Sequence, residues 1–463
     1  MTAYGGANRR SHDSEPTLRQ TMKPITAAVI TLGCRLNQAD SALLHDRLIR
    51  LGFQIVPPDA SSSPNLIVIN SCTVTETAYK KSKQALHSIR AENPQSFIVF
   101  TGCAADVSRD ELEQSQDIDL LLLNEQKKEI ETILPKYLAL LEERKAPAAP
   151  KLAKGVFAEQ AVGVFPFRSR SFIKVQEGCN NQCSYCIVPT ARGPERSRDL
   201  KEITAEFRKA VDDGFHEIVL TGVNTCHYKA GRTAMPELID RLCEIPGDFR
   251  IRLSSTEPCD EVIPIIDAMK RNAGKVCEFL HLPIQSGCDE ILTAMNRHCD
   301  TAKFVEYAAY ARAAIPNLHL GTDVIVGFPG ETAANFEESL EFLRKMEFAN
   351  IHIFPYSPRS GTPAAKLTKK VQKSAVTDRI EQLKALKEES ARKFAQSLVG
   401  TTGAVLIESN CNKKELWDGW SGNYVRTIVS SDKDLSRQLL PVKFVRFLPV
   451  GALFAEIQHP QKG

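Results

Sequence analysis

The sequence predicts an α/β protein in three successive parts: a small parallel α/β domain, a partial TIM-like (β/α)6 barrel and a small C-terminal β-barrel. Strand-like apolar runs alternate with helix-patterned stretches in the first third of the chain and again from about residue 171, which predicts the first two parts. Short apolar runs broken by glycine after residue 398 predict the third. A length of 463 residues favours about three domains.

Composition and charge are those of an ordinary globular chain. The net charge of +3 means that any nucleic-acid surface must be a local patch. Residues 1–24 carry charge but no apolar core, so we expect a disordered lead-in and no secretory signal. No apolar run reaches the ~18 residues of a membrane span, so no membrane partner is expected. Thirteen cysteines in scattered positions do not suggest a disulfide scaffold and favour a reducing cytoplasm.

The first predicted domain spans 25–145. Its strand-like runs and helix-patterned stretches alternate at 27–33, 39–53, 65–71, 76–94 and 96–102. A cysteine follows each of the three strands: Cys34, Cys72 and Cys103. Functional groups of open α/β sheets gather at the carboxyl ends of the strands, so we expect these thiols to meet at one edge. Each of them alone is equally well explained as a buried core residue.

A linker rich in alanine and proline is predicted within 146–164, followed by the barrel domain at 165–395. The barrel has fewer strand candidates than the eight of a complete TIM barrel, at 171–178, 217–224, 249–255, 275–286, 318–331 and 349–357. Functional side chains of such barrels lie where strands end, which singles out Asn224, Glu257, Gln285 and Glu331.

The sequence QEGCNNQCSYCIVPTARG, at 176–193, places Cys179, Cys183 and Cys186 at C-x3-C-x2-C spacing. Zinc sites normally close with four protein ligands, and disulfides need an even number of cysteines. Iron–sulfur clusters take thiolates in close runs, and three thiolates leave one iron of a cubane open for a small molecule. Zinc or incidental core cysteines are the alternative. The cysteines outside both sets are expected to be reduced structural residues: Cys226, Cys243, Cys259, Cys277, Cys288, Cys299 and Cys411.

The last predicted domain, 396–463, has the pattern of a small antiparallel barrel, a module that often holds RNA. The preceding stretch 366–394 carries nine Lys or Arg and four Asp or Glu on a helical pattern, which predicts a basic amphipathic helix. Within WDGWSGNYVR, Trp417, Trp420 and Tyr424 are candidates to stack on bases and Arg426 to meet phosphate. Each is equally explained as a barrel core residue.

Long motifs in this order resemble the radical-SAM methylthiotransferase family over nearly the whole chain beyond residue 24. They are TLGCRLNQADS, NSCTVTETA, TGCAA, CNNQCSYCIVPTARGPERSR, RLSSTEP, HLPIQSG, GTDVIVGFPGET and FPYSPRSGTPA. The resemblance implies an N-terminal cluster domain, a radical-SAM core and a C-terminal TRAM-like RNA-binding domain. No catalytic side chain beyond the cluster ligands is expected.

The resemblance also implies two [4Fe–4S] clusters, one on Cys34, Cys72 and Cys103 and one on the second cysteine set, which would bind S-adenosylmethionine (SAM). One SAM would methylate a sulfur on the first cluster. A second SAM, cleaved at the second cluster, would yield the radical that removes a substrate hydrogen, so that C–H becomes C–S–CH3. An electron donor and a sulfur source that the sequence does not identify would also take part. The implied cofactor contacts are Tyr185, Gly222, Asn224, Glu257 and Gln285.

These motifs most resemble those of the branch that converts N6-threonylcarbamoyladenosine at position 37 of tRNA to its 2-methylthio derivative. The anticodon stem-loop of tRNA is therefore the expected partner. The isopentenyladenosine branch has Gln-Met-Asn after the first cysteine, whereas this chain has Arg-Leu-Asn there, beginning at Arg35. An arginine would bind the threonylcarbamoyl carboxylate bidentately, and the candidates are Arg35 and Arg192. Arg196, in the loop after the second cysteine set, is a further candidate to bind a phosphate or the substrate. The alternatives are isopentenyladenosine, a ribosomal-protein aspartate and, more remotely, a non-catalytic iron–sulfur scaffold.

Overall fold

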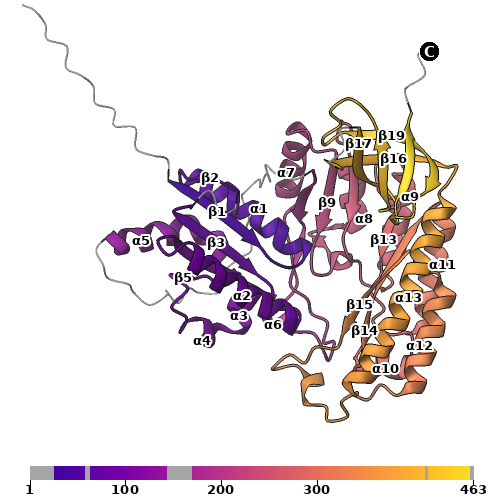
Figure 1. Ribbon diagram of the computed structural model, residues 1–463, viewed down its shortest axis with the longest axis horizontal. Coiled ribbons are helices and arrows are strands. Elements are labelled where there is room, and N and C mark those ends of the chain that lie inside the picture. Colours follow the sequence, from indigo (N-terminus) through magenta and orange to yellow (C-terminus); the bar gives the residue numbers. More distant parts are fainter. Residues whose placement is uncertain (1–24, 58–62, 143–168, 412–414, 459–463) are drawn as a thin grey trace, which may run out of the picture.

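The computed structural model describes residues 25–57, 63–142, 169–411 and 415–458, and it confirms the predicted α/β fold (Figure 1). An N-terminal parallel sheet, a partial barrel and a closed C-terminal barrel follow one another along the chain. The predicted lead-in and linker lie outside the described residues. None of the helices in the described ranges is long and apolar enough to cross a membrane.

Five parallel strands form the N-terminal sheet, in the order β2-β1-β3-β4-β5. Its central strands were predicted, and the short edge strands were not. The strands are β1 (Thr26–Thr31), β2 (Gln54–Ile55), β3 (Leu66–Ser71), β4 (Phe97–Gly102) and β5 (Leu120–Leu121). The helices are α1 (Arg35–Arg50), α2 (Glu76–Glu92), α3 (Cys103–Val107), α4 (Arg109–Leu112), η1 (Gln126–Glu129) and α5 (Ile130–Glu142).

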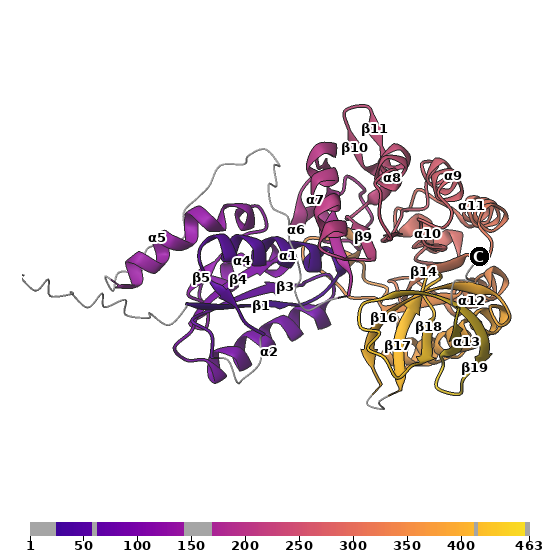
Figure 2. The same ribbon diagram turned by 90° about the horizontal axis from the view of Figure 1, so that it is seen from above.

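Helices cover both faces of this sheet, because successive strand residues point to opposite faces (Figure 2). Val68 and Val99 pack with α1 and α5 on one face, and Ile67 and Ile98 pack with α2, α3 and α4 on the other. Burial on both faces explains why the central strands are continuous apolar runs.

Six parallel strands form the partial barrel, as the sequence predicts: β6 (Ser171–Lys174), β9 (Glu217–Thr221), β12 (Arg250–Leu253), β13 (Phe279–His281), β14 (His319–Val326) and β15 (Asn350–Pro355). They pair as two three-stranded sheets, which a backbone bridge between Ile251 and Val276 joins. The predicted strand 275–286 is too long, since it contains Pro283, which has no N–H to donate to a ladder.

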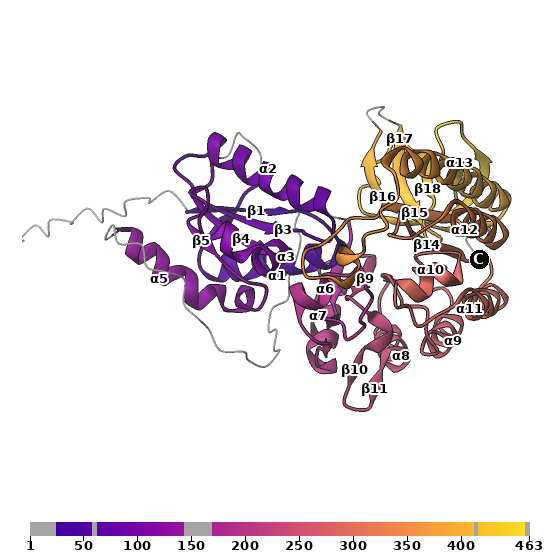
Figure 3. The same ribbon diagram turned by 90° about the horizontal axis from the view of Figure 1, so that it is seen from below.

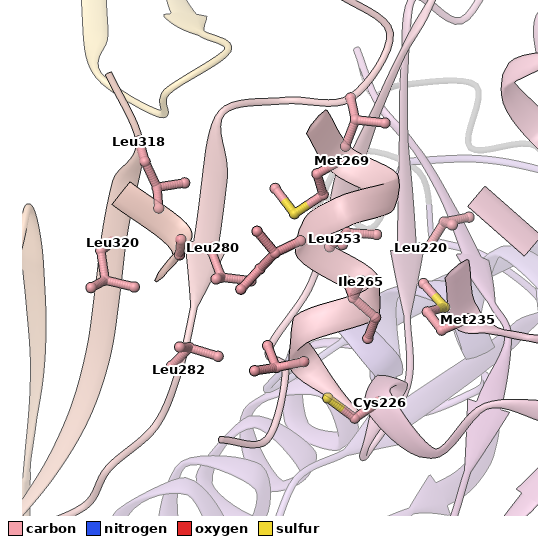
Figure 4. Packing of buried hydrophobic residues seen from close by; sticks show 14 of the residues in the cluster. Leu220, Cys226, Met235, Leu253, Ile265, Met269, Leu280, Leu282, Leu318 and Leu320 are labelled. Carbon is pink, nitrogen blue, oxygen red and sulfur yellow. The ribbon is translucent and has the colours of Figure 1, made fainter. Parts of the chain in front are cut away.

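The remaining elements of the barrel cover its outer side or connect its strands. The helices are α6 (Val188–Arg192), α7 (Leu200–Asp212), η2 (Thr225–His227), α8 (Met235–Cys243), α9 (Val262–Arg271), α10 (Asp289–Ala294), α11 (Thr301–Ala314), α12 (Ala333–Met346) and η3 (Pro363–Lys366). The short strands are β7 (Gln176–Glu177), β8 (Arg196–Ser197), β10 (Lys229–Ala230) and β11 (Thr233–Ala234). Leu253 and Leu280 meet Ile265 and Met269 of α9 in the outer core (Figure 4).

Helix α13 (Lys373–Ser397) packs against α12 and β15 and leads into the C-terminal barrel (Figure 3). The closed barrel has the strand order β16-β17-β18-β20-β19. Its pairing is antiparallel except between β18 and β20, which are parallel, because an odd number of strands cannot alternate in direction around a closed ring. The strands are β16 (Thr402–Asn410), β17 (Leu416–Ser421), β18 (Arg426–Ser430), β19 (Leu439–Phe447) and β20 (Leu453–Ile457).

Two buried arginines of β12 attach the C-terminal barrel to the partial barrel. Arg250 donates to the carbonyl oxygens of Ala404 and Trp420 at 2.7 and 2.8 Å. Arg252 donates to the carbonyl of Gly422 at 2.9 Å. The buried Glu217 carboxylate accepts from both guanidinium groups at 2.7 Å, so their charge is compensated where water is excluded.

Candidate functional site

The first cysteine set lies at the carboxyl edge of the N-terminal sheet. Cys34 precedes α1, Cys72 follows β3 and Cys103 begins α3. Cys72 and Cys103 are buried, whereas Cys34 is exposed. Gly33 has a φ of +101°, and a Cβ there would lie 2.7 Å from the Cys72 sulfur, so the close approach of the two loops requires glycine. The Asn37 amide donates to one carbonyl in each loop at 2.7 Å and fixes their spacing.

An arginine of the barrel reaches this set. Arg192 ends α6 and is buried, and its Nε donates to the Cys103 sulfur at 3.2 Å. The same guanidinium donates to Glu177 Oε1 at 2.7 Å and to Asn37 Oδ1 at 2.6 Å, and it lies 3.1 Å from Asp40. Each of its three nitrogens is therefore engaged within the protein, and it joins the two domains beside a cysteine.

The second cysteine set lies in the loop after β7, at the carboxyl ends of the barrel strands. Cys179, Cys183 and Cys186 are each partly buried and line one cavity. Gly178 starts the loop with a φ of +74°, and a Cβ there would lie 1.9 Å from the carbonyl oxygen of Pro194. Only glycine fits this close approach, which explains the glycine beside the first cysteine of the motif.

The spacing of the sulfur atoms distinguishes between two kinds of metal site. Among the described residues, neither cysteine set has its three sulfur atoms all within 4.8 Å of one another. Three thiolates on one tetrahedral zinc would lie within about 4.6 Å, because each Zn–S bond is ~2.3 Å long. A cubane places its thiolates on different irons and spreads them farther apart. Both sets thus fit an iron–sulfur cluster better than a single ion.

Burial keeps thiols of both sets neutral when no metal is bound. Burial raises the pKa of Cys72 and of Cys179 to about 11 and that of Cys186 to about 12. At neutral pH these groups are neutral thiols on their own, and a bound cation is what would hold them as thiolates.

A cavity of about 330 Å³ opens beside the second cysteine set. Three of the predicted cofactor contacts line it: Tyr185, Glu257 and Gln285. Gln285 has a φ of +80°, a strained value for a residue with a side chain, and such strain is common at functional sites. Arg297, which sequence reasoning missed because no motif surrounds it, pairs with Glu257 at 2.7 Å and lies 3.6 Å from the Cys183 sulfur.

The other two predicted cofactor contacts follow β9. Gly222 lines a second cavity, of about 440 Å³. Asn224 is buried, and neither atom of its side-chain amide has a hydrogen-bond partner among the described residues. An unsatisfied buried amide is costly unless a ligand completes it. Val223, between them, lines both cavities. These residues therefore fit a polar cofactor such as SAM.

The second cavity lies between the two cysteine sets. Cys34, Cys103 and Arg35 line it on one side, and Val74, Val188, Asp323 and Phe354 are shared with the first cavity. Sequence reasoning missed two histidines there. His281 Nε2 lies 2.9 Å and His352 Nδ1 lies 3.1 Å from the same oxygen of Asp323. HLPIQSG and GTDVIVGFPGET contain the first histidine and the aspartate, but periodicity alone does not orient them.

The predicted substrate-binding residues divide into free and engaged groups. Arg196 pairs with Glu125 at 2.6 Å, and Arg192 is fully engaged as described above. Arg426 is held by Asp418, with oxygens at 2.8 and 3.1 Å from its Nε. Arg35 differs from these three, because it forms no ion pair within the described residues and faces the cavity.

Aromatic residues of the C-terminal barrel reach the same cavity. Trp420 and Tyr424 stack with ring centres 4.7 Å apart. Both line a groove of about 870 Å³ between α13 and the barrel, and Tyr424 also lines the cavity between the cysteine sets. The Arg35 guanidinium lies 5.4 Å from the Tyr424 ring centre and 5.7 Å from that of Phe279. The groove and the cavity thus share Tyr424 as a wall.

Comparisons with known proteins bear on this site. Residues 173–343 match the model of the radical SAM superfamily, and residues 26–123 match the model described as "Uncharacterized protein family UPF0004". Among solved structures, the radical S-adenosylmethionine methyltransferase TsrM from Kitasatospora setae, with cobalamin and a [4Fe–4S] cluster bound, covers 74% of this chain and 77% of its own, with a TM-score of 0.54 and 16% identity. This likeness supports the fold alone.

Two curated relatives cover most of the chain. "Threonylcarbamoyladenosine tRNA methylthiotransferase MtaB" from Thermotoga maritima is 36% identical over 87% of this chain and 90% of its own length. "tRNA-2-methylthio-N(6)-dimethylallyladenosine synthase" from Corynebacterium glutamicum is 31% identical over 98% of this chain and 85% of its own. The chain therefore belongs to the radical-SAM tRNA methylthiotransferases, a family that implies a [4Fe–4S] cluster and SAM.

Proposed function

We propose that this enzyme converts N6-threonylcarbamoyladenosine at position 37 of tRNA to its 2-methylthio derivative. The observation that carries the choice of substrate is Arg35, a cation without an ion-pair partner in the described residues, in the cavity between the two cysteine sets. The threonylcarbamoyl group carries a carboxylate, and a guanidinium binds a carboxylate through two parallel hydrogen bonds. The stack of Arg35 on Tyr424 and Phe279 would hold the guanidinium plane for that contact.

The cluster that binds SAM would be held by Cys179, Cys183 and Cys186. When bound, this cluster supplies the electron that cleaves SAM. Gln285 and the unpartnered amide of Asn224 would bind polar groups of SAM. The remaining chain residues position and shield this site. Arg297 holds the Glu257 carboxylate on the cavity wall and lies 3.6 Å from the Cys183 sulfur.

The first set, Cys34, Cys72 and Cys103, would hold a second [4Fe–4S] cluster, the carrier of the sulfur to be transferred. Arg192 supports this assignment, because its buried guanidinium donates to the Cys103 sulfur and partly offsets the burial that raises the pKa of this thiol. The cavity between the sets would then place the adenine between the two clusters.

RNA would approach along the groove beside the C-terminal barrel. The Trp420 and Tyr424 rings offer a stacking surface. Arg392 of α13 lines the groove together with Glu388 and Glu389, so the rings and not the charge of the groove support this proposal. Because Tyr424 borders both spaces, a nucleotide that leaves the groove passes this ring before it reaches the cavity.

Binding of synthetic anticodon stem-loops tests the choice of substrate. Arg35→Met should weaken binding of the threonylcarbamoyl stem-loop about 10- to 100-fold, the equivalent of ~1.5–3 kcal/mol for a charged hydrogen-bonded contact. Binding of the unmodified stem-loop should change little, and Arg35→Lys should retain part of the affinity. An equal loss for both stem-loops would refute the role of Arg35.

Dimethylallyladenosine is the second candidate, because the same cavity has aromatic walls, Phe279, Phe354 and Tyr424, that would suit an apolar group. Mass spectrometry of tRNA nucleosides from a strain that lacks the gene decides between them. We expect 2-methylthio-N6-threonylcarbamoyladenosine to disappear. Loss of the methylthio-dimethylallyl nucleoside alone would show that the second candidate is right.

Replacing either cysteine set with alanine separates their roles. Without Cys179, Cys183 and Cys186, about half of the iron and all SAM cleavage should be lost. Without Cys34, Cys72 and Cys103, formation of 5′-deoxyadenosine should continue while the methylthio product disappears. Methylthiolation at the wild-type rate in the latter variant would make those cysteines core residues.

A further inference from the structure

A second type of metal-ligating group lies outside both cysteine sets, where β9 and β12 end. Cys226 and His227 belong to η2, directly after β9, and Cys259 and Glu261 belong to the segment after β12. The ligand atoms of His227, Cys259 and Glu261 all lie within 4.8 Å of one another. The thiol of Cys259 is also within hydrogen-bonding reach of Cys226. Two segments far apart in the sequence thus bring four donors together.

We propose that Cys226, His227, Cys259 and Glu261 bind a zinc ion. Two donors on one tetrahedral zinc lie at most about 4.6 Å apart, since Zn–S, Zn–N and Zn–O bonds are ~2.0–2.3 Å long. The donor atoms of His227, Cys259 and Glu261 lie within 4.8 Å of one another, close to this limit, unlike the atoms of the two cysteine sets. The Cys226 sulfur lies outside that group and must move toward it to bind the same ion. Two thiolates, an imidazole and a carboxylate are all zinc ligands, and together they complete four-coordination.

The surroundings of His227 support the assignment independently. Its Nδ1 lies 2.9 Å from Glu195 Oε1, which leaves Nε2 as the ligand atom. A zinc-bound histidine typically donates its other ring N–H to such a carboxylate, which fixes the ring orientation. Glu261 is exposed and the His227 side chain is 30% exposed, so an ion can enter. Cys226 lies at the edge of the outer core (Figure 4).

The consequence concerns the wall of the SAM cavity. The sulfur atoms of Cys226 and Cys259 lie 3.2 and 3.4 Å from the carbonyl oxygen of Glu257. Thr225, also in η2, donates to the carbonyl of Ser255 at 3.0 Å. Both Ser255 and Glu257 line that cavity. With Cys226 as its fourth ligand, the ion would be structural, without an open position for substrate, and would link η2 to the segment after β12.

Metal analysis of the cluster-loaded enzyme, purified without oxygen, tests the proposal. The wild type should hold about one zinc per chain in addition to its iron. Cys226→Ser and Cys259→Ser should lose the zinc, while Cys243→Ser, a buried cysteine elsewhere in the barrel, should keep it. Zinc X-ray absorption should show two sulfur and two lighter ligands at the bond lengths above. His227→Asn and Glu261→Gln change partly exposed residues and should each lower zinc affinity at least 10-fold with iron content unchanged.

Three results would overturn the proposal. The first is a wild-type enzyme that holds no zinc and takes up none when Zn²⁺ is added. The second is equal zinc affinity in the wild type, His227→Asn and Glu261→Gln, which covers the case in which the cysteine variants do not fold. The third is a disulfide between Cys226 and Cys259 in place of the ion. None of these readouts depends on methylthiotransferase activity, so the outcome is separate from that of the proposed substrate.

Discussion

Replacing Arg192 with methionine should destabilise the contact between the N-terminal domain and the barrel. The arginine is buried and donates to Glu177, Asn37 and the sulfur of Cys103. Methionine fills similar space but offers none of these donors. The acceptors stay buried and lose a partner, which costs more than the loss of an exposed ion pair.

The structure limits the size of the effect. Removing one member of a buried ion pair costs about 3–5 kcal/mol. Burial alone would raise the pKa of Asp40, but Lys127, Lys174 and Arg192 together hold it well below its usual value. In the variant, Asp40 keeps both lysines, at 2.7 and 2.8 Å, and Glu177 keeps Lys174 at 3.3 Å. The expected loss is therefore at the lower end, about 3 kcal/mol.

Arg196→Met is the control, because Arg196 lies in the same region and its ion pair is with Glu125, whose side chain is 41% exposed. Its contacts to the Arg192 carbonyl, at 3.1 Å, and to Glu177, at 3.9 Å, are longer than the 2.7 Å between Arg192 and Glu177. That pair should be worth at most ~1 kcal/mol. Urea unfolding followed by far-ultraviolet circular dichroism reports on all helices. Tryptophan fluorescence reports only on the C-terminal barrel, since Trp417 and Trp420 are the two tryptophans of the chain. The circular-dichroism transition should shift far more than the fluorescence transition.

A double-mutant cycle tests the physical reason. Glu177→Gln removes a charge that Arg192 neutralises, so Arg192→Met with Glu177→Gln should lose less stability than the sum of the two single changes. Additive effects, or a loss in Arg192→Met no greater than that in Arg196→Met, would refute the view that buried charge compensation holds the two domains together.

Two further changes have directions that the structure determines. Gly178→Ala should lower iron content at the second cysteine set, because a Cβ at its φ of +74° would lie 1.9 Å from the Pro194 carbonyl. Gly214→Ala, after α7, with a φ of +83° but open space, should cost only about 1 kcal/mol and keep its iron; equal iron loss in both would contradict this. Burial lowers the pKa of His319 from 6.5 to about 3, assisted by Arg252. Between these values the unfolded chain binds a proton that the folded chain does not, so stability falls as pH falls, by about 1.4 kcal/mol at pH 5.5. His319→Gln should lose this part of the acid sensitivity in urea titrations at several pH values, and an unchanged pH dependence would contradict the assignment.

Periodicity and strand-end cysteines were enough to predict the α/β fold and its parallel sheets, because burial on both faces produces continuous apolar runs. Side-chain partners were not predictable. Sequence alone does not distinguish Arg192 from Arg35, because both follow predicted cluster cysteines. In the structure, Arg192 pairs with buried carboxylates, whereas Arg35 faces a cavity. Arg297 and His352 lie in no motif that sequence reasoning used. The fold of the partial barrel brings Arg297 to Glu257 and His352 to Asp323, beside the cavities.

The arrangement makes the three parts of the chain dependent on one another. The first cysteine set belongs to the N-terminal domain and the second to the barrel, and Arg192 crosses between them to reach a sulfur of the first set. The C-terminal barrel supplies Tyr424 to the same cavity, and its own position depends on Arg250 and Arg252 of β12. A change at either junction would therefore alter the cavity without touching a cysteine. Because radical chemistry depends on close placement of substrate, such changes should lower product formation more than SAM cleavage, which the proposed assignment places at the barrel's own cysteines.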